Sequence, residues 1–204
     1  MTAEVGGKLD AAFERFLSVY TRFGGQNYYG WDHHADAQNF RGPVFWSEQD
    51  CAFRLGLELE KEFPFCVHYE FSVASWTFAD FDKAIDKIGR IDLAVTDLHD
   101  FVENETSQER FQRHQHDIFI EAKYFPAGCT KTWRYDHETK VPAVYADAAR
   151  LAKHLERGHC KVGACLVVDD DGLFAELYDP ATWPASVRLL HASPVKIPGI
   201  AVGL

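Results

Sequence analysis

The run from Asp117 to Phe125 has the apolar composition of a buried strand, yet it contains two opposite charges, Glu121 and Lys123. Side chains alternate across a strand, so both charges point to the same face of the sheet. A carboxylate and an ammonium are costly to bury unless they are paired, hydrogen-bonded or bound to a metal. The pattern therefore indicates a functional site. The simpler alternative is a salt bridge on a solvated face of the sheet.

A second strand is predicted over residues 89–96, with its apolar side chains on one face and Asp92 on the other. The apolar side chains expected to share a face are Ile91, Leu93 and Val95. If this strand pairs with the one that carries Glu121 and Lys123, three ionisable groups meet at one place. The two segments together therefore predict a cluster of charges inside a sheet.

Helical spacing of apolar residues predicts a helix over residues 46–63, ahead of these strands. Ser47 is its expected N-cap, with Asp50 three residues later in a box-like position, and Pro64 is expected to end it. Glu48 lies in the first turn, where the helix dipole favours an acid whatever the function. The helix therefore offers a further carboxylate, with a structural explanation that is equally good.

Other elements are predicted around the two charged strands. Glu70 lies on the predicted strand at 65–73 and is a further candidate acid. His114 and His116 are expected in solvent, with proton transfer or metal binding as the alternative. The predicted elements are a strand at 65–73, a helix at 144–156 that Gly158 ends, a strand at 160–168 buried on both faces, and a strand at 173–178.

An acid on one strand followed by Glu-x-Lys on the next resembles the motif of the PD-(D/E)xK nuclease superfamily, which has the restriction-endonuclease-like fold. Asp92, Glu121 and Lys123 occupy the motif positions. Ile91 precedes Asp92, at the position of the proline in the superfamily's name. The predicted order of helix, strand, strand, strand, helix and strand is also that of the superfamily core. The resemblance implies an α/β protein with a restriction-endonuclease-like core, a mixed central β-sheet flanked by helices, and an extra N-terminal helix.

The resemblance also implies a function. It implies a metal-dependent nuclease that hydrolyses phosphodiester bonds of nucleic acid, with DNA as the expected substrate, Mg²⁺ as the cofactor and Mn²⁺ as a substitute. Asp92, Glu121 and the backbone carbonyl of Ala122 would be the metal ligands, and oxygen ligands are those that Mg²⁺ prefers. Lys123 would orient the attacking water and offset charge in the transition state. Glu48 matches the position from which the first helix brings a glutamate near the metal in many members.

Three segments are expected along the 204 residues. Residues 1–46 form an N-terminal helix and an aromatic-rich irregular segment packed on the core, residues 47–178 form the nuclease-like core, and residues 179–204 form a C-terminal tail. Residues 24–34 have two interpretations: base stacking or a substrate lid, or an irregular segment anchored by buried aromatic side chains. The apolar face of the N-terminal helix comprises Leu9, Phe13, Phe16, Leu17, Tyr20 and Phe23.

The formal net charge of −10 opposes a nuclease function, because proteins that bind duplex DNA usually present a basic surface. A local basic patch is enough to contact a phosphate backbone. One alternative is a non-catalytic member of the same fold that acts as a partner-binding or regulatory protein; another is an unrelated α/β protein with a surface salt bridge. Local basic clusters are formed by Lys131, Arg134 and Lys140, and by Arg150, Lys153 and Arg157.

The sequence predicts a cytoplasmic protein with no membrane partner. It contains no run long and apolar enough to span a bilayer, and its first residues lack the apolar centre of a signal peptide. The five cysteines are an odd number without a Cys-x-x-Cys pair, which argues against a disulfide framework. A homodimer or a complex with a partner protein is plausible, since cutting two strands requires two sites.

Overall fold

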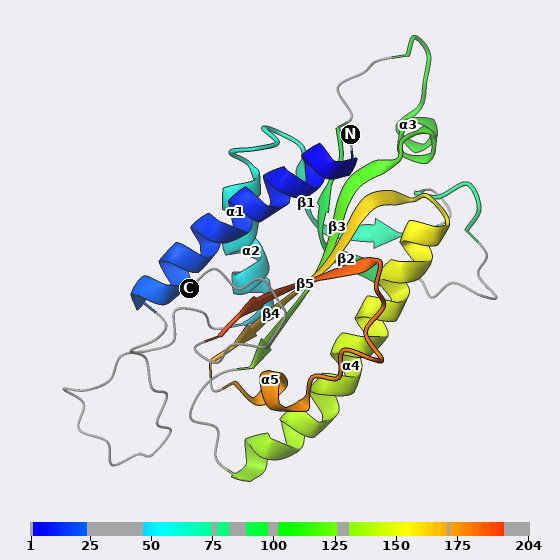
Figure 1. Ribbon diagram of the computed structural model, residues 1–204. Helices are drawn as coiled ribbons and strands as arrows, with labels where there is room; N and C mark the ends of the chain where they lie inside the picture. Colours follow the sequence, from blue (N-terminus) through cyan, green and yellow to red (C-terminus); the bar gives the residue numbers. More distant parts are fainter. Residues whose placement is uncertain are drawn as a thin grey trace.

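A five-stranded mixed sheet forms the centre of the protein, in the order β1-β2-β3-β4-β5. The computed structural model describes residues 2–23, 47–74, 77–81, 89–97, 102–125, 131–170 and 172–193. The helices α1 and α2 lie on one side of the sheet, and the long helix α4 lies on the other (Figure 1). The elements are α1 (Thr2–Phe23), α2 (Glu48–Leu59), β1 (Val67–Val73), β2 (Gly89–Val95), α3 (Ser107–Arg113), β3 (His116–Phe125), α4 (Lys131–Glu156), β4 (Cys160–Asp169), α5 (Leu173–Leu177) and β5 (Val187–Ala192).

The sheet changes direction at its middle strand. β1 pairs with β2 and β2 pairs with β3 in antiparallel fashion, whereas β3, β4 and β5 are parallel. The long helix α4 makes the crossover between β3 and β4, as a parallel pair requires. The predictions of an α/β fold, a mixed sheet flanked by helices and an N-terminal helix are confirmed. The predicted order of elements between α2 and β4 is also present, with the short helix α3 inserted before β3.

The helices on the first face follow from local sequence signals. The Ser47 side chain accepts a hydrogen bond from the backbone N–H of Asp50 at 3.2 Å, so α2 begins where its N-cap was predicted. It ends at Leu59, five residues before Pro64. In α1, the predicted apolar stripe is buried against α2 and the sheet, apart from Phe23, whose side chain is not described. The buried members are Leu9, Phe13, Phe16, Leu17 and Tyr20.

The central strand β3 separates two layers of the core. Ile120 and Ala122 pack with residues of α1 and α2, while Phe119 packs with residues of α4. Glu121 and Lys123 alternate with Ala122 and therefore face α4. The prediction that both charges share one face of a buried strand is confirmed.

Strand β2 departs from the predicted alternation. Leu93 packs in the cluster with α1 and α2, but Ile91 packs in the cluster that contains residues of α4, so they do not share a face. The change occurs at Asp92, between the register pairs Leu93–Tyr69 and Ile91–Phe71. Glu70, between those two partners on β1, has a φ of +52°, in the left-handed region that interrupts regular strand geometry. The sequence prediction of one shared face was therefore wrong at Ile91.

Residues after β4 also differ from the predictions. Residues 173–177 form the helix α5 instead of a strand, because the Asp169 carboxylate accepts the backbone N–H groups of Phe174 (2.9 Å) and Ala175 (3.2 Å). These are donors that a helix N-terminus leaves free. In the segment predicted as a tail, β5 adds a fifth strand in parallel to β4.

Two further predictions were incomplete or wrong. The helix predicted from Val144 begins at Lys131, while Gly158 follows its end with a φ of +71°, as predicted. His116 is buried rather than solvated, surrounded by the rings of Phe71 and Phe119, and burial lowers its pKa to about 3. The aromatic segment 24–34 lies outside the described residues. None of the helices in the described ranges combines the length and the apolarity needed to cross a bilayer.

Gly56 on α2 marks a close approach between this helix and β1. A Cβ at this position would lie 2.2 Å from the Tyr69 hydroxyl oxygen. We expect Gly56→Ala to destabilise the protein by about 1–3 kcal/mol, because Tyr69 must leave its place beside Phe53. The matched control is Gly7→Ala on α1, where a Cβ meets nothing within 4 Å and should stabilise by about 0.5–1 kcal/mol. Equal urea midpoints for the two variants would contradict this packing.

Candidate functional site

The site forms where β2 and β3 stop pairing through their backbones. The register between these strands runs from Val95–Ile118 to Leu93–Ile120, and Asp92 is the next residue of β2 beyond the last pair. There the backbone N–H of Ala122 donates to Asp92 Oδ2 at 2.7 Å. The Asp92 side chain thus contacts β3 immediately beside Glu121. This contact brings the acid of one strand to the Glu-x-Lys segment of the next, as predicted.

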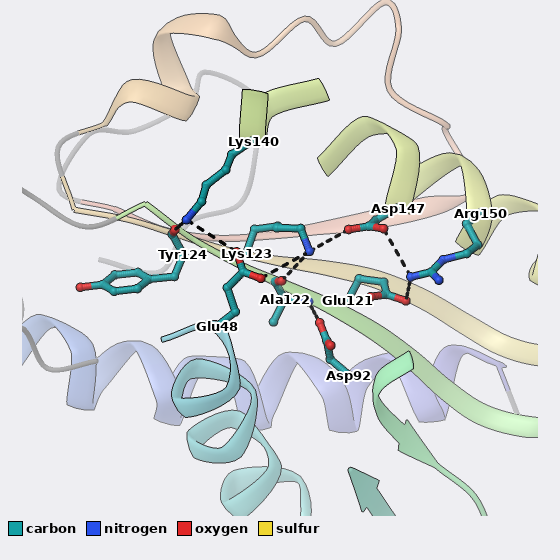
Figure 2. Close-up of polar contacts among 9 residues, drawn as sticks. All are labelled: Glu48, Asp92, Glu121, Ala122, Lys123, Tyr124, Lys140, Asp147 and Arg150. Atoms are coloured by element: carbon teal, nitrogen blue, oxygen red, sulfur yellow. Dashed lines mark hydrogen bonds and ion pairs between the residues drawn. The ribbon is translucent and has the colours of Figure 1, made fainter. Parts of the chain in front are cut away.

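Glu121 is a buried carboxylate, with 3% of the residue exposed. Its Oε1 forms an ion pair with Nη2 of Arg150, which projects from α4 toward the sheet (Figure 2). Burial raises the pKa of Glu121 above its ordinary value, and the Arg150 guanidinium offsets part of this effect. Asp92 and Asp147 act in the same direction as burial, because neighbouring negative charges disfavour ionisation. An additional positive charge nearby would therefore stabilise the ionised form of this carboxyl group.

Lys123 lies among oxygen atoms from three elements. Its Nζ is 2.9 Å from Asp147 Oδ2 on α4, 3.7 Å from Glu48 Oε2 on α2, and donates to the Ala122 carbonyl at 3.1 Å. Burial lowers the pKa of this lysine, but the hydrogen bond and charge of Asp147, with Glu48 and Asp92, outweigh it and raise the pKa overall. Lys123 is therefore held as an ammonium.

Glu48 reaches the site because Ser47 fixes the start of α2. Its Oε1 is 3.8 Å from Nζ of Lys140, which also donates to the Tyr124 carbonyl at 3.2 Å. The structure thus brings Glu48 to Lys123 and Lys140, at the opposite end of the cluster from Glu121 (Figure 2). Glu48 is therefore an ion-pair partner of Lys123.

The two other candidate acids differ in their environments. Asp92 has a raised pKa, mainly through burial, while the Ala122 N–H and Lys123 act against the shift. Glu70 is exposed, and its carboxylate pairs with Arg90 at 3.1 Å. It contributes to the raised pKa of Asp92 through its charge. Glu70 therefore influences the site electrostatically, while its side chain is held by Arg90.

Sequence reasoning missed Asp147 and assigned Arg150 and Lys140 a different place. Asp147 lies three residues after Val144 and four before Leu151, on the buried side of α4, where an acid is unexpected. That position was the available signal. Arg150 and Lys140 were predicted in basic surface clusters, but both are ion-paired inside the site. Their charges compensate the local acids.

The donor set suits a hard cation. No group of three or more His, Cys, Asp or Glu side chains in the described ranges has the spacing of a metal site. Asp92 and Glu121 nevertheless offer two carboxylates, and Ala122 offers a carbonyl oxygen on the same stretch of β3. Mg²⁺ usually takes only one or two protein carboxylates and completes its shell with water and phosphate oxygens. Two carboxylates and a carbonyl oxygen are therefore the kind of donor set that Mg²⁺ takes.

The net charge of the cluster also favours a bound cation. Its carboxylates are Glu48, Asp92, Glu121 and Asp147, and its cations are Lys123, Lys140 and Arg150. When all of these groups are ionised, the acids exceed the bases by one charge, and burial raises the pKa values of both Asp92 and Glu121. A divalent cation would reverse this local excess and favour the ionised form of both carboxyl groups.

No known protein family, curated protein or solved structure matches this chain. The interpretation of the site therefore rests on the order of the elements and on the geometry of the residues themselves. These residues are Asp92, Glu121 and Lys123, which the sequence pattern predicted, together with Asp147 and Arg150 from α4.

The raised pKa of Glu121 predicts a pH dependence of stability. Its ordinary pKa is 4.5 and its folded pKa is higher, so its contribution is complete below 4.5 and declines as the pH rises through the folded pKa. We expect Glu121→Gln to remove this decline, with a ceiling of about 1.4 kcal/mol per pH unit. Urea unfolding of both proteins at pH 5, 7 and 9 in chelator tests it. Parallel pH profiles would contradict the assignment.

Proposed function

We propose that this protein is a Mg²⁺-dependent nuclease with a restriction-endonuclease-like core, which hydrolyses phosphodiester bonds of nucleic acid, DNA being the expected substrate. The observation that carries the proposal is the contact of Asp92 with the Ala122 amide at 2.7 Å, which places this acid beside Glu121 and Lys123. The element order from α2 to β4 supports it further. Geometry and order agree with the resemblance found in the sequence.

Each residue has a role that its surroundings support. Asp92, Glu121 and the Ala122 carbonyl would hold Mg²⁺, which supplies a Lewis acid for the phosphodiester when bound. Lys123 carries a positive charge, fixed by Asp147, where negative charge develops on the phosphate during hydrolysis. Its N–H groups can also orient the attacking water. Glu48 positions Lys123 from the other side.

The net charge of −10 favours a substrate that is contacted over a small area. Within the site, Arg150 and Lys140 are already paired with acids, so they do not form an open basic surface in this state. We therefore propose that the protein acts on a short stretch of nucleic acid, or that a partner protein supplies part of the binding surface. Both versions predict that this protein alone binds long duplex DNA weakly and, because it makes few phosphate contacts, with a shallow dependence on salt.

The second candidate is a non-catalytic protein of the same fold that binds a partner. The observation that favours it is the completeness of the ion pairs: Arg150 neutralises Glu121, and Asp147 neutralises Lys123. A network of this kind can stabilise the fold without any cation. The two candidates differ in whether the acids exchange their protein partners for a metal.

Cleavage assays distinguish these candidates. The protein is incubated with supercoiled plasmid, single-stranded DNA and RNA, each with Mg²⁺, with Mn²⁺ and with chelator. The nuclease proposal predicts cleavage that requires the cation and disappears in Glu121→Gln. Cleavage by wild type and variant alike would reveal a contaminant. The absence of cleavage with all three substrates, together with the absence of cation binding, would favour the non-catalytic candidate.

A further inference from the structure

Arg150 satisfies Glu121 in the way that a bound cation would. It lies on α4, 29 positions after Glu121, and reaches across the face of the sheet to place Nη2 against Oε1 of this carboxylate (Figure 2). A carboxylate that is 3% exposed requires a compensating charge. In the cation-free protein this charge comes from Arg150. The same carboxylate is one of the two that fit Mg²⁺.

The position of Arg150 leaves part of its guanidinium unsatisfied. Its Nη2 contacts both Glu121 and Asp147, and lies 3.3 Å from Oδ1 of Asp147. Its Nε is buried and has no hydrogen-bond partner among the described residues. A buried donor without a partner is unfavourable. Because 34% of the Arg150 side chain is exposed, the guanidinium can move into solvent without unfolding α4.

We propose that Arg150 is an exchangeable counter-ion: it holds Glu121 in the cation-free protein and leaves when a divalent cation binds to Asp92 and Glu121. This inference rests on the proposed function. A divalent cation at Glu121 repels a guanidinium at the same oxygen, so both cannot occupy it. The released fork of N–H groups matches the two oxygens of a phosphate, which places Arg150 as a contact for the substrate backbone.

Calorimetric titration with Mn²⁺ in the absence of nucleic acid tests the exchange. Arg150→Gln removes the competitor, and we expect it to bind Mn²⁺ about tenfold more tightly than wild type. The matched control is Lys153→Gln, which removes one positive charge from an exposed position on the same helix. We expect its affinity to stay within about twofold of wild type, because an exposed charge farther from the site is screened.

The outcomes separate the inference from the proposed function. If wild type binds Mn²⁺ in a manner that requires Asp92, but Arg150→Gln binds equally or more weakly, the counter-ion role is wrong and the metal site stands. If none of the proteins binds Mn²⁺, the metal site and the exchange both fail. Equal gains in Arg150→Gln and Lys153→Gln would reduce the effect to general electrostatics and overturn the specific role.

Side-chain NMR of the wild type provides a second measurement, should Arg150→Gln fold poorly. The Arg150 guanidinium protons are expected to be protected from exchange with water in chelator, where the ion pair with Glu121 forms. Saturating Mg²⁺ should accelerate their exchange, because the side chain moves into solvent. Chemical-shift changes at Asp92 and Ala122 verify that Mg²⁺ is saturating. Unchanged protection of the Arg150 guanidinium protons under these conditions would overturn the proposal.

Discussion

Replacing Lys123 with glutamine is expected to reduce phosphodiester cleavage by about 10²- to 10⁴-fold, the range typical of losing a positioned proton-transfer or charge-stabilising group. The physical reason is that Lys123 places a positive charge and N–H donors within reach of Ala122, where the phosphate would lie. Cation binding should persist, because Lys123 is not a ligand. Single-turnover cleavage rates and Mn²⁺ titrations of the same samples measure the two effects separately.

Lys161 offers a matched control for Lys123. It lies on the neighbouring strand β4, its side chain is 18% exposed compared with 17% for Lys123, and it pairs with Asp117 at 2.6 Å. Lys161→Gln should therefore cost similar stability while leaving the cleavage rate within about twofold of wild type. If both lysine variants lose activity in proportion to their loss of stability, the catalytic role of Lys123 is contradicted.

Replacing Asp92 with asparagine is expected to weaken Mn²⁺ binding by about two orders of magnitude or more, since the loss of a group that merely supports a ligand already costs about 10- to 100-fold. Cleavage should fall at least in parallel. Asparagine keeps an oxygen that can accept the Ala122 N–H, so the contact between β2 and β3 is preserved. The loss of affinity then reports on the carboxylate charge.

Asp117→Asn is the corresponding control for Asp92→Asn. Asp117 lies near the start of β3, is 13% exposed at the side chain and pairs with Lys161. This variant should bind Mn²⁺ as wild type does, because its carboxylate lies outside the site. Calorimetry on the two aspartate variants at one pH tests the pair. Equal affinities in Asp92→Asn and wild type would exclude Asp92 as a ligand.

Local patterns predicted the parts of the fold that position the site. The Ser47 cap, the apolar runs of β3 and β4, and Gly158 after α4 depend on residues near one another in the sequence. The same holds for the shared face of Glu121 and Lys123, because it follows from strand periodicity alone. These features carried the prediction of Asp92, Glu121 and Lys123 as one cluster.

The features that sequence reasoning missed depend on contacts across the fold. The change of face at Ile91 accompanies the positive φ of Glu70 on another strand. The helix α5 forms where Asp169 binds its first N–H groups, which a short apolar run does not reveal. Arg150 is unremarkable in sequence, and its role appears only when α4 is placed against Glu121. Tertiary placement, rather than local propensity, determines each of these features.

The most direct test of the account is a crystal structure with Mn²⁺, located by its anomalous scattering. We expect a single strong peak bound by a carboxylate oxygen of Asp92, a carboxylate oxygen of Glu121 and the carbonyl oxygen of Ala122, with oxygen distances close to those of Mg²⁺, about 2.0–2.2 Å. In the same crystals, Arg150 should no longer contact Glu121. A peak elsewhere, or none at saturating Mn²⁺ with the ion pair of Glu121 and Arg150 intact, would contradict the metal site.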